Sequence, residues 1–249
     1  MSEDTIYTEK DDAEPGGVEP FRFNDEVARV FPDMLRRSIP GYAASLEAMG
    51  SLAARYVRPS THCYDLGCSL GAASIAMRQA IRVDECRIVA LDNAPAMVSR
   101  CREVVEEDRK RRPDCTPIDV VEGDILDAKL SNASMVVLNY TLQFLAVDER
   151  DRIIRNIYDA LIDGGVLMLS EKVVDPDPAM EALLVDLHHE HKRRNDYSAL
   201  EISRKRAALE NVLIPETVND HRDRLVRSGF SSAAVWLRFF NFVSIIAIR

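Results

Sequence analysis

From Cys63 onward, short apolar runs alternate with segments in which apolar residues recur at helical spacing. We predict strands at the apolar runs 63–66, 87–91, 119–121, 134–138 and 166–169. Helices begin near Leu70 and Pro95, and a third helix precedes Gly164-Gly165, which we expect to end it. This alternation of strands and helices predicts a parallel sheet covered on both faces, the arrangement of the α/β class.

The flanking segments extend this prediction in both directions. Asn24 is placed to cap a helix that we expect to stop at Pro32, and a second helix precedes the first strand. A helical segment occupies 175–228, and the apolar runs 233–240 and 242–248 then predict two closing strands. Residues 1–20 are polar and acidic, so we expect a mobile tail followed by a single α/β domain at 21–249.

Composition and charge narrow the class of protein. At 249 residues, with 47% hydrophobic and 29% charged residues, the chain is long enough for one large globular domain. The net charge of −9 disfavours a protein that binds the phosphate backbone of nucleic acids, so we expect no direct contact with nucleic acid. The five cysteines form no C-x-x-C pair, which indicates reduced thiols in a cytoplasmic protein without a metal or redox site. No apolar run reaches the roughly 20 residues that cross a bilayer, so membrane insertion is not expected.

Residues 64–73 have the pattern of a strand end, a glycine turn and a helix start. Gly67 and Gly71 can take backbone angles closed to other residues, and the helix N-terminus behind them offers free N–H groups to a ligand. Asp65 precedes this loop, and its carboxylate would repel the pyrophosphate of a dinucleotide bound there. An acidic residue beside the loop suits a ligand with cationic groups and no phosphate, so we predict a site for S-adenosyl-L-methionine.

Further polar residues follow the next strands, and the carboxyl ends of parallel strands meet at the edge where open α/β sheets bind ligands. Asp92 and Asn93 follow the second strand, where a carboxylate would accept hydrogen bonds from ribose hydroxyls. Asp124 and Ile125 follow the third, suited to an adenine amino group and to the adenine ring, and Asn139 follows the fourth. Each residue alone is as easily explained as a helix cap, but four strand ends in succession favour a ligand site.

The helical segment 175–228 is the natural place for recognition of a second substrate and for dimer contacts. His188 and His191 share one apolar stripe; they could bind a metal or transfer a proton, but without a third ligand we favour packing at an interface. A capping box at 198–201 predicts a helix that carries Arg206 on its apolar face and Arg204 on the opposite face. The Arg206 guanidinium then needs an anionic partner, either a structural carboxylate or the carboxylate of a substrate.

With these residues assembled, the sequence closely resembles the carboxy-S-adenosyl-L-methionine synthase family over nearly its whole length. The matching segments are 30–34, 38–42, 64–72, 122–125, 133–139, 141–145 and 200–203, and departures are confined mainly to the first 20 residues and to 107–117. The resemblance implies a class I methyltransferase-like Rossmann-type fold. Such a fold has a mostly parallel seven-stranded sheet with an antiparallel closing strand, here with a helical insertion before the last two strands.

The resemblance also implies a reaction, in which S-adenosyl-L-methionine and prephenate yield carboxy-S-adenosyl-L-methionine, phenylpyruvate and water. In the implied mechanism, prephenate loses carbon dioxide and hydroxide, the sulfonium methyl becomes an ylide, and the ylide captures the carbon dioxide. A separate enzyme then uses the product to carboxymethylate a tRNA wobble uridine. The resemblance further implies a homodimer that needs no metal.

Carried over position by position, the family's contacts with S-adenosyl-L-methionine fall at the strand ends and in the loops beside them. They are Tyr42, Gly67, Cys68, Ser69, Asp92, Asn93, Asp124, Ile125, Asn139 and Arg206. Arg206, supplied by the neighbouring subunit, is implied to hold the new carboxylate and is the one catalytic residue that the resemblance assigns. A closed site suits this chemistry, because water would quench the ylide.

Three other functions are compatible with parts of this pattern. An ordinary small-molecule methyltransferase would share every cofactor residue and differ only in its acceptor. A non-catalytic S-adenosyl-L-methionine-binding protein would keep the glycine loop without needing Arg206 for activity. A nicotinamide dehydrogenase would share Asp92 but neither Asp65 nor Asp124. We expect the synthase, because the matching segments are far more specific than a glycine loop.

Overall fold

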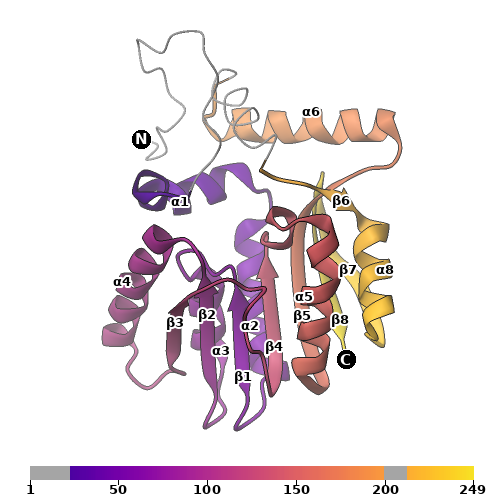
Figure 1. Cartoon of the computed structure of the whole chain (residues 1–249). Coiled ribbons are helices and arrows are strands. Elements are labelled where there is room, and N and C mark those ends of the chain that lie inside the picture. The colour runs from indigo at the N-terminus through magenta and orange to yellow at the C-terminus, as the bar shows by residue number, and fades with distance from the viewer. Residues whose placement is uncertain (1–22, 199–211) are drawn as a thin grey trace.

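A computed structural model describes residues 23–198 and 212–249, and the strands in these ranges form one mixed sheet (Figure 1). The strand order is β3-β2-β1-β4-β5-β8-β7, with the two-residue β6 beside β5. The strands are β1 His62–Leu66, β2 Arg87–Asp92, β3 Ile118–Glu122, β4 Ala133–Asn139, β5 Leu161–Val174, β6 Glu216–Thr217, β7 Ser232–Phe239 and β8 Phe242–Ile248.

The helices of the described ranges lie on both faces of this sheet and across one of its edges (Figure 1). They are α1 Asp25–Ser38, α2 Tyr42–Tyr56, α3 Ala72–Ala80, α4 Pro95–Arg111, the short 3₁₀ helix η1 Leu142–Phe144, α5 Val147–Ala160, α6 Pro178–Arg194 and α8 Val218–Ser228. In Figure 1 the parallel strands point upward, and α1 and α6 lie above their ends. The edge where open α/β sheets bind ligands is therefore the edge beneath these two helices.

Alternating side chains of the central strands build the two halves of the core. Met135 and Val137 of β4 pack with Met49 and Met77 of α2 and α3, whereas Val136 belongs to the cluster on the opposite face, which contains α5. Because successive strand residues point to opposite faces, the almost continuous apolar run of β4 is buried on both sides. The predicted α/β class and the antiparallel closing strand are confirmed, since β8 runs antiparallel to β5 and to β7.

Helix α1 differs from its predicted extent. Val27 N–H donates to Asn24 Oδ1 over 3.0 Å, which confirms the cap, but the helix continues through Pro32 to Ser38. Phe31 and Met34, on either side of the proline, are buried in one cluster with other apolar residues. Burial of both side chains offsets the lost N–H, so tertiary packing overrides the local preference.

Helix α5 also ends elsewhere than predicted. It stops at Ala160, and β5 begins at Leu161 and runs through both glycines, with Gly164 at a φ of 73°. Leu161 is buried and pairs with Ala133 at the start of β4. Gly164-Gly165 therefore shapes the first part of a long strand and does not terminate the helix.

Several predictions fall outside the described residues. The tail expected at 1–20 and the residues 199–211, with Arg206, belong to this group. The single domain at 21–249 and the extent of the helical segment 175–228 likewise stay predictions. Within the described ranges, no helix combines the length and the apolar character that crossing a bilayer requires.

A buried ionic network joins α5 to the chain that enters α8. The Arg150 side chain is completely buried, and its guanidinium donates to the carbonyl oxygens of Gln143, Leu145 and Ile214 and pairs with Glu216. Arg224 pairs with the same carboxylate. The network fixes the position of residues 214–216 against η1.

Replacement of Arg150 by methionine tests this network. Arg150→Met leaves three carbonyl oxygens and the Glu216 carboxylate without the buried guanidinium, so we expect a loss of about 3–5 kcal/mol in the free energy of unfolding. Arg152→Met on the exposed side of α5 is the matched control and should change stability by less than about 0.5 kcal/mol. Urea denaturation of the two variants measures the difference, and equal stabilities would show that the network contributes little.

Candidate functional site

The glycine loop follows β1 in a left-handed conformation. Gly67, Ser69 and Gly71 have φ angles of 76°, 49° and 80°. The backbone N–H groups of Gly67 and Cys68 both donate to Leu91 O, over 2.8 and 2.9 Å. A Cβ atom at position 67 would lie 2.3 Å from Thr141 Cγ2, so a side chain there collides with its neighbour as well as straining the backbone. The loop thus lies against the ends of β2 and β4.

Asp92 at the end of β2 holds this loop through its carboxylate. Oδ2 accepts from Ser69 N over 2.8 Å, and Oδ1 accepts from Ala94 N over 2.9 Å. Burial raises the pKa of Asp92, and these hydrogen bonds partly offset the rise. Each oxygen keeps a lone pair for a ligand hydroxyl, as the sequence predicts for ribose. The adjacent Asn93 is exposed.

Asp65 at the end of β1 has a structural role that the sequence argument missed. It is completely buried, and its Oδ2 accepts from both Ser74 N and Ser74 Oγ, over 3.0 and 2.6 Å. The bond caps the first turn of α3. Burial raises the pKa of Asp65 to about 6, and the negative charge of Asp92 adds to the rise. Two carboxylates that repel each other electrostatically, Asp65 and Asp92, therefore lie beside the glycine loop.

The turn after β3 is hydrogen-bonded to the end of β2. Gly123 N donates to Asp92 O over 3.0 Å, so Asp124 lies next to the end of β2. Asp124 is exposed, and its Oδ1 accepts from Leu126 N over 2.9 Å. Ile125 is only 6% exposed and packs into the core. The sequence predicts this pair at the adenine, and the structure places it beside Asp92.

Asn139 at the end of β4 carries the polar atom that is best suited to a ligand contact. Its Oδ1 is buried and, within the ranges 23–198 and 212–249, has no hydrogen-bond partner. A buried carbonyl oxygen without a partner costs about 1–3 kcal/mol, which a donor from a bound ligand would recover. Tyr42 begins α2, and burial followed by the charge of Asp65 raises its pKa. Tyr42 therefore remains a neutral phenol beside the predicted sulfonium region.

Cys68 differs from the other predicted contacts. The residue is buried, and its pKa is raised above the ordinary value by hydrogen bonding to Cys101 and by burial. Its side chain packs with Cys101 in the core between β2 and α4, so only its backbone is available to a ligand. All five cysteines are free thiols.

Glu171 is a buried group at this edge that the sequence analysis did not find. Its carboxylate accepts from Leu142 N and Gln143 N, over 2.9 and 3.0 Å, and so caps η1. Burial raises its pKa to about 8, against the effect of those hydrogen bonds. The sequence did contain a signal for Glu171, namely an acidic residue directly after an apolar strand. A carboxylate buried in a strand requires hydrogen-bond donors, so such a residue has a specific role.

Tyr140 joins these groups from the end of β4. It takes a left-handed φ of 63°, and its N–H donates to Ser170 O over 2.7 Å. Burial raises its pKa, and the charge of Glu171 and the neighbouring Tyr42 add to the rise. Its ring packs edge-on against Phe242 of β8 at 5.9 Å. Tyr140 directly follows Asn139 and interacts electrostatically with Tyr42.

His188 and His191 of α6 do not act together. His188 is buried, and its Nε2 lies 2.9 Å from Ser38 O, so the neutral ring donates a hydrogen bond to the backbone of α1. Burial lowers its pKa to about 2. His191 is partly exposed, and its Nε2 lies 3.4 Å from the Asn195 amide nitrogen. Among the described residues, no three His, Cys, Asp or Glu side chains are grouped as metal ligands. His188 is therefore a tether between helices.

Arg206, the predicted carboxylate clamp, lies outside the described residues, but both flanks of 199–211 are fixed near the site. On one side, Arg37 Nε donates to Asn195 O over 2.7 Å, and its guanidinium stacks on the Tyr197 ring at 4.0 Å. On the other side, Ile214 N donates to Gln143 O over 2.9 Å, next to the backbone that Glu171 caps. The described residues on both sides of 199–211 therefore lie at this edge.

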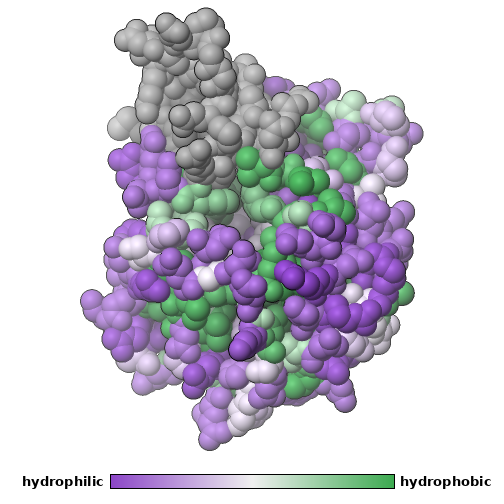
Figure 2. All heavy atoms as spheres, viewed as in Figure 1, coloured by the Kyte–Doolittle hydropathy of each residue, from purple (hydrophilic) through white to green (hydrophobic). Residues whose placement is uncertain are grey.

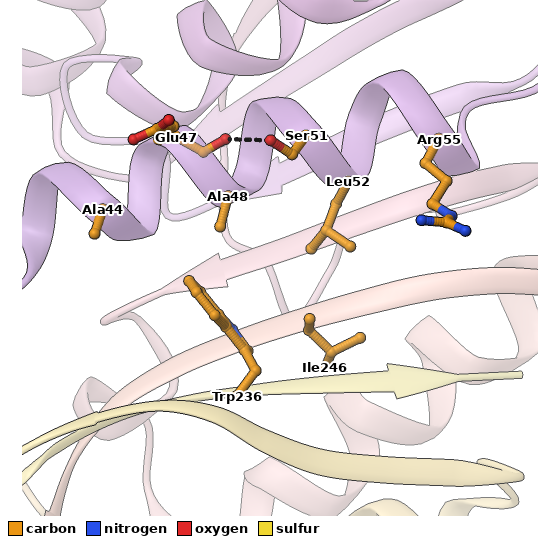
Figure 3. A pocket seen from close by; sticks show the side chains of 8 residues that line it. All are labelled: Ala44, Glu47, Ala48, Ser51, Leu52, Arg55, Trp236 and Ile246. Carbon is orange, nitrogen blue, oxygen red and sulfur yellow. Dashed lines mark hydrogen bonds between the residues drawn. The ribbon is translucent and has the colours of Figure 1, made fainter.

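A shallow groove of about 350 Å³ lies elsewhere, between α2 and the β7–β8 pair (Figure 3). Trp236 and Ile246 face Leu52 across it. None of the predicted site residues lines this groove. We place the candidate site at the strand ends, because the polar residues that line the groove, Glu47, Ser51 and Arg55, are exposed along a single helix and do not converge on a ligand.

Comparison with known proteins identifies related sequences. A family model described as a methyltransferase domain matches residues 64–165. The chain is 49% identical over 246 residues to a Vibrio campbellii protein named carboxy-S-adenosyl-L-methionine synthase, covering 99% of this chain and 97% of that protein. It is 51% identical to a Yersinia pestis protein of the same name, over 91% of this chain and 84% of that one.

Solved structures show the same fold at low identity. The S-adenosylmethionine-dependent methyltransferase SibL is 14% identical, with a TM-score of 0.60 over 90% of this chain and 58% of that one. A protein from Methanococcus maripaludis, described as a candidate S-adenosyl-L-methionine-dependent methyltransferase, is 20% identical, with a TM-score of 0.58 over 95% and 96% of the two chains. The fold is thus the methyltransferase-like Rossmann α/β fold, as the sequence predicts.

Substitution of Gly67 tests whether the glycine loop binds the ligand, apart from the effect of backbone strain on stability. Gly67→Ala places a methyl group against Thr141, so we expect weaker S-adenosyl-L-methionine binding in calorimetry in addition to lower stability. Gly164→Ala is the control, because its φ of 73° is similar and its Cβ would meet no atom within 4 Å. The strain alone costs about 1–2 kcal/mol. If both variants bind the ligand as the unchanged protein does, the loop is not the binding element.

The Glu171 carboxyl predicts a pH dependence of stability. Its pKa in the folded protein, about 8, lies above the ordinary 4.5, so the folded state holds this proton more tightly than the unfolded chain. The contribution of Glu171 to stability is fully present below pH 4.5, the ordinary pKa of a glutamate. It is lost as the pH rises through the folded pKa of about 8. Urea denaturation should show the unchanged protein losing stability over this range more steeply than Glu171→Gln. If the stability of both proteins changes with pH in the same way, the raised pKa of Glu171 is contradicted.

Proposed function

The chain belongs to the carboxy-S-adenosyl-L-methionine synthase family, and on this premise we propose that it converts S-adenosyl-L-methionine and prephenate into carboxy-S-adenosyl-L-methionine, phenylpyruvate and water. The observation that carries the reaction is identity at about half of the aligned positions, spread over 91% or more of the chain. The protein is accordingly a transferase.

The charges of the site support S-adenosyl-L-methionine as the ligand. Asp65 and Asp92 interact electrostatically beside the loop, which favours a ligand that brings an ammonium and a sulfonium. The same carboxylates would repel a pyrophosphate, so a dinucleotide is a poor fit. The unpartnered Asn139 Oδ1 supports the proposal as well, because buried acceptors in proteins are normally hydrogen-bonded and the ligand's ammonium is a donor.

Each predicted contact has a role in this proposal. Asp92 accepts from the ribose hydroxyls and Asp124 from the adenine amino group, while Ile125 packs on the adenine ring. The remaining contacts surround the methionine part and the sulfonium; they are Tyr42, Gly67, Cys68, Ser69, Asn93 and Asn139. We assign no metal to the reaction and no strong protein base, since the departing hydroxide balances the proton lost from the sulfonium methyl.

Arg206 completes the proposed site from the neighbouring subunit of a homodimer, where it binds the new carboxylate. Two observations support this arrangement. The residues flanking 199–211 are fixed beside η1 and α1, and Met180 and Leu183 of α6 are exposed apolar side chains suited to an interface. Hydrophobic residues are visible around α6 among hydrophilic ones in Figure 2. A guanidinium binds a carboxylate through paired donors, which suits this position.

The cellular context follows from the product. We propose that a separate enzyme uses carboxy-S-adenosyl-L-methionine to modify a tRNA wobble uridine, so that this protein itself binds no tRNA. The net charge of −9 and the free thiols support a cytoplasmic protein of this kind. Prephenate is then its only partner besides S-adenosyl-L-methionine and its own second subunit.

An ordinary methyltransferase is the second candidate, because the matching family model and the structural neighbours are methyltransferases. Incubation with S-adenosyl-L-methionine and prephenate decides between the two. The synthase forms a product heavier than S-adenosyl-L-methionine by the mass of carbon dioxide, together with phenylpyruvate and without S-adenosylhomocysteine. Formation of S-adenosylhomocysteine with a methylated acceptor would instead identify a methyltransferase.

Arg206 should be essential for the proposed activity. We expect Arg206→Ala to reduce formation of the carboxylated product by about 100-fold or more, because the developing carboxylate loses its cation. Arg204→Ala is the matched control, since the sequence predicts Arg204 on the opposite side of the same helix, and it should keep activity within about twofold. Mass spectrometry of the product measures both variants, and equal rates would remove Arg206 from the mechanism.

A further inference from the structure

The turn that follows β4 has a strained backbone. Tyr140 has a φ of 63°, in the left-handed region that is unfavourable for a residue with a side chain. Such residues persist only where the surrounding structure holds them, and they are concentrated at ligand sites. Residues 139–141, which we call the β4 turn, begin at the end of β4 and so lie at the edge of the candidate site. The groups that hold this turn therefore shape that edge.

Gln143 holds the β4 turn through its side-chain amide. Its Nε2 donates to Tyr140 O over 3.3 Å, and its Oε1 accepts from Lys172 N of β5 over 3.0 Å. The two partners fix which way the amide points, because a backbone N–H only donates and a carbonyl oxygen only accepts. Tyr140 N donates to Ser170 O over 2.7 Å. The strained residue is thus held at its N–H by β5 and at its carbonyl oxygen by Gln143.

Gln143 is itself fixed by its backbone. The residue is only 5% exposed, and its N–H donates to Glu171 Oε2 over 3.0 Å. Its carbonyl oxygen accepts from Ile214 N over 2.9 Å and from Arg150 Nη2 over 3.3 Å. Each of the four polar groups of Gln143 therefore has a partner within the protein. A side chain held in this way is preorganised to keep its neighbours in one geometry.

The β4 turn borders the glycine loop through Thr141. A Cβ atom at Gly67 would lie 2.3 Å from Thr141 Cγ2 and 2.5 Å from Thr141 Oγ1, so the threonine side chain fills the space over the glycine. The next residue, Leu142, donates its N–H to Glu171 Oε1 over 2.9 Å. The turn is therefore packed against the loop that we propose to bind S-adenosyl-L-methionine.

Asn139 lies at the other end of the same turn. Its backbone pairs with Ser170 of β5, and its Oδ1 is buried without a hydrogen-bond partner in the described part of the chain. Buried acceptors are normally hydrogen-bonded, so a fixed orientation of this oxygen is useful only if a ligand supplies the donor. Because Tyr140 directly follows, its left-handed conformation sets the direction in which the chain leaves Asn139.

We propose that Gln143 is a positioning residue for S-adenosyl-L-methionine: its amide holds the β4 turn in the conformation that presents Asn139 Oδ1 to the ligand. This inference rests on the proposed function and deepens it, because it assigns a role to a residue whose own polar groups are all occupied within the protein. The amide acts by restricting the conformations of the turn before the ligand arrives. Its loss therefore weakens binding, since the turn must then be ordered on binding.

Calorimetry of S-adenosyl-L-methionine binding to Gln143→Met tests the proposal. Methionine is similar in volume and keeps the backbone hydrogen bonds, but it removes both bonds of the amide. We expect the Kd to rise about tenfold. Ser134→Ala is the matched control, because Ser134 is also buried and its Oγ lies 2.8 Å from Thr61 Oγ1 at the opposite end of β4. It should lower the melting temperature but keep the Kd within about twofold.

A double-mutant cycle shows whether Gln143 acts through Asn139. Asn139→Ala alone should raise the Kd about tenfold, because the ligand loses an acceptor. Adding Gln143→Met to it should raise the Kd by no more than about twofold further, since the oxygen that the turn positions is already absent. Effects that multiply to about a hundredfold would show that Gln143 acts independently of Asn139, which overturns the inference.

Glu171→Gln carries the same test if Gln143→Met does not fold. An amide at this position accepts only one of the two N–H bonds from η1, so the turn is loosened from its other side. We expect the Kd to rise about threefold, and again by no more than about twofold when the change is combined with Asn139→Ala. An unchanged Kd in a folded variant of this kind overturns the positioning role.

The outcomes separate this inference from the proposed function. If the unchanged protein binds S-adenosyl-L-methionine and the cycle gives the expected result, but no carboxylated product forms from prephenate, the proposed reaction fails and the role of Gln143 stands. If the unchanged protein does not bind S-adenosyl-L-methionine, both fail.

Discussion

The hydrogen bond between Ser69 N and the Asp92 carboxylate fixes the geometry on which the site depends. It joins the left-handed loop after β1 to the end of β2, and Gly123 N, bonded to Asp92 O, brings the turn after β3 to the same point. Three separate strand ends are thereby held together by the protein's own hydrogen bonds. The binding edge is largely preorganised, which reduces the entropy lost on binding.

The part of the site that could be predicted depends on local sequence pattern. Asp92, Asp124 and Asn139 lie at the strand ends where apolar runs stop, and topology alone brings such ends to one edge. Gly67 is recognisable because its left-handed turn and close neighbour admit no side chain. The positions of these residues could therefore be derived from the sequence, whereas their contacts with a ligand stay predictions.

The part that could not be predicted depends on packing between distant elements. Pro32 continues its helix only because Phe31 and Met34 are buried on either side of it. The raised pKa of Glu171 and the burial of Lys192 arise from segments far apart in sequence, so neither residue differs locally from an ordinary surface charge. Hydrophobic periodicity identifies an element, but the partners of a buried charge follow from tertiary structure.

The reversal of β8 has a consequence for how such enzymes can diversify. Because β8 runs against β5, the tight connection from β7 arrives at the edge where the parallel strands end. Phe240 and Asn241 occupy that connection, while the residues that we propose to contact the adenosyl group come from the other half of the sheet. A change in this two-residue hairpin therefore alters the edge beside β5 without touching the ends of β1, β2 and β3, so that the two parts of the edge can vary separately.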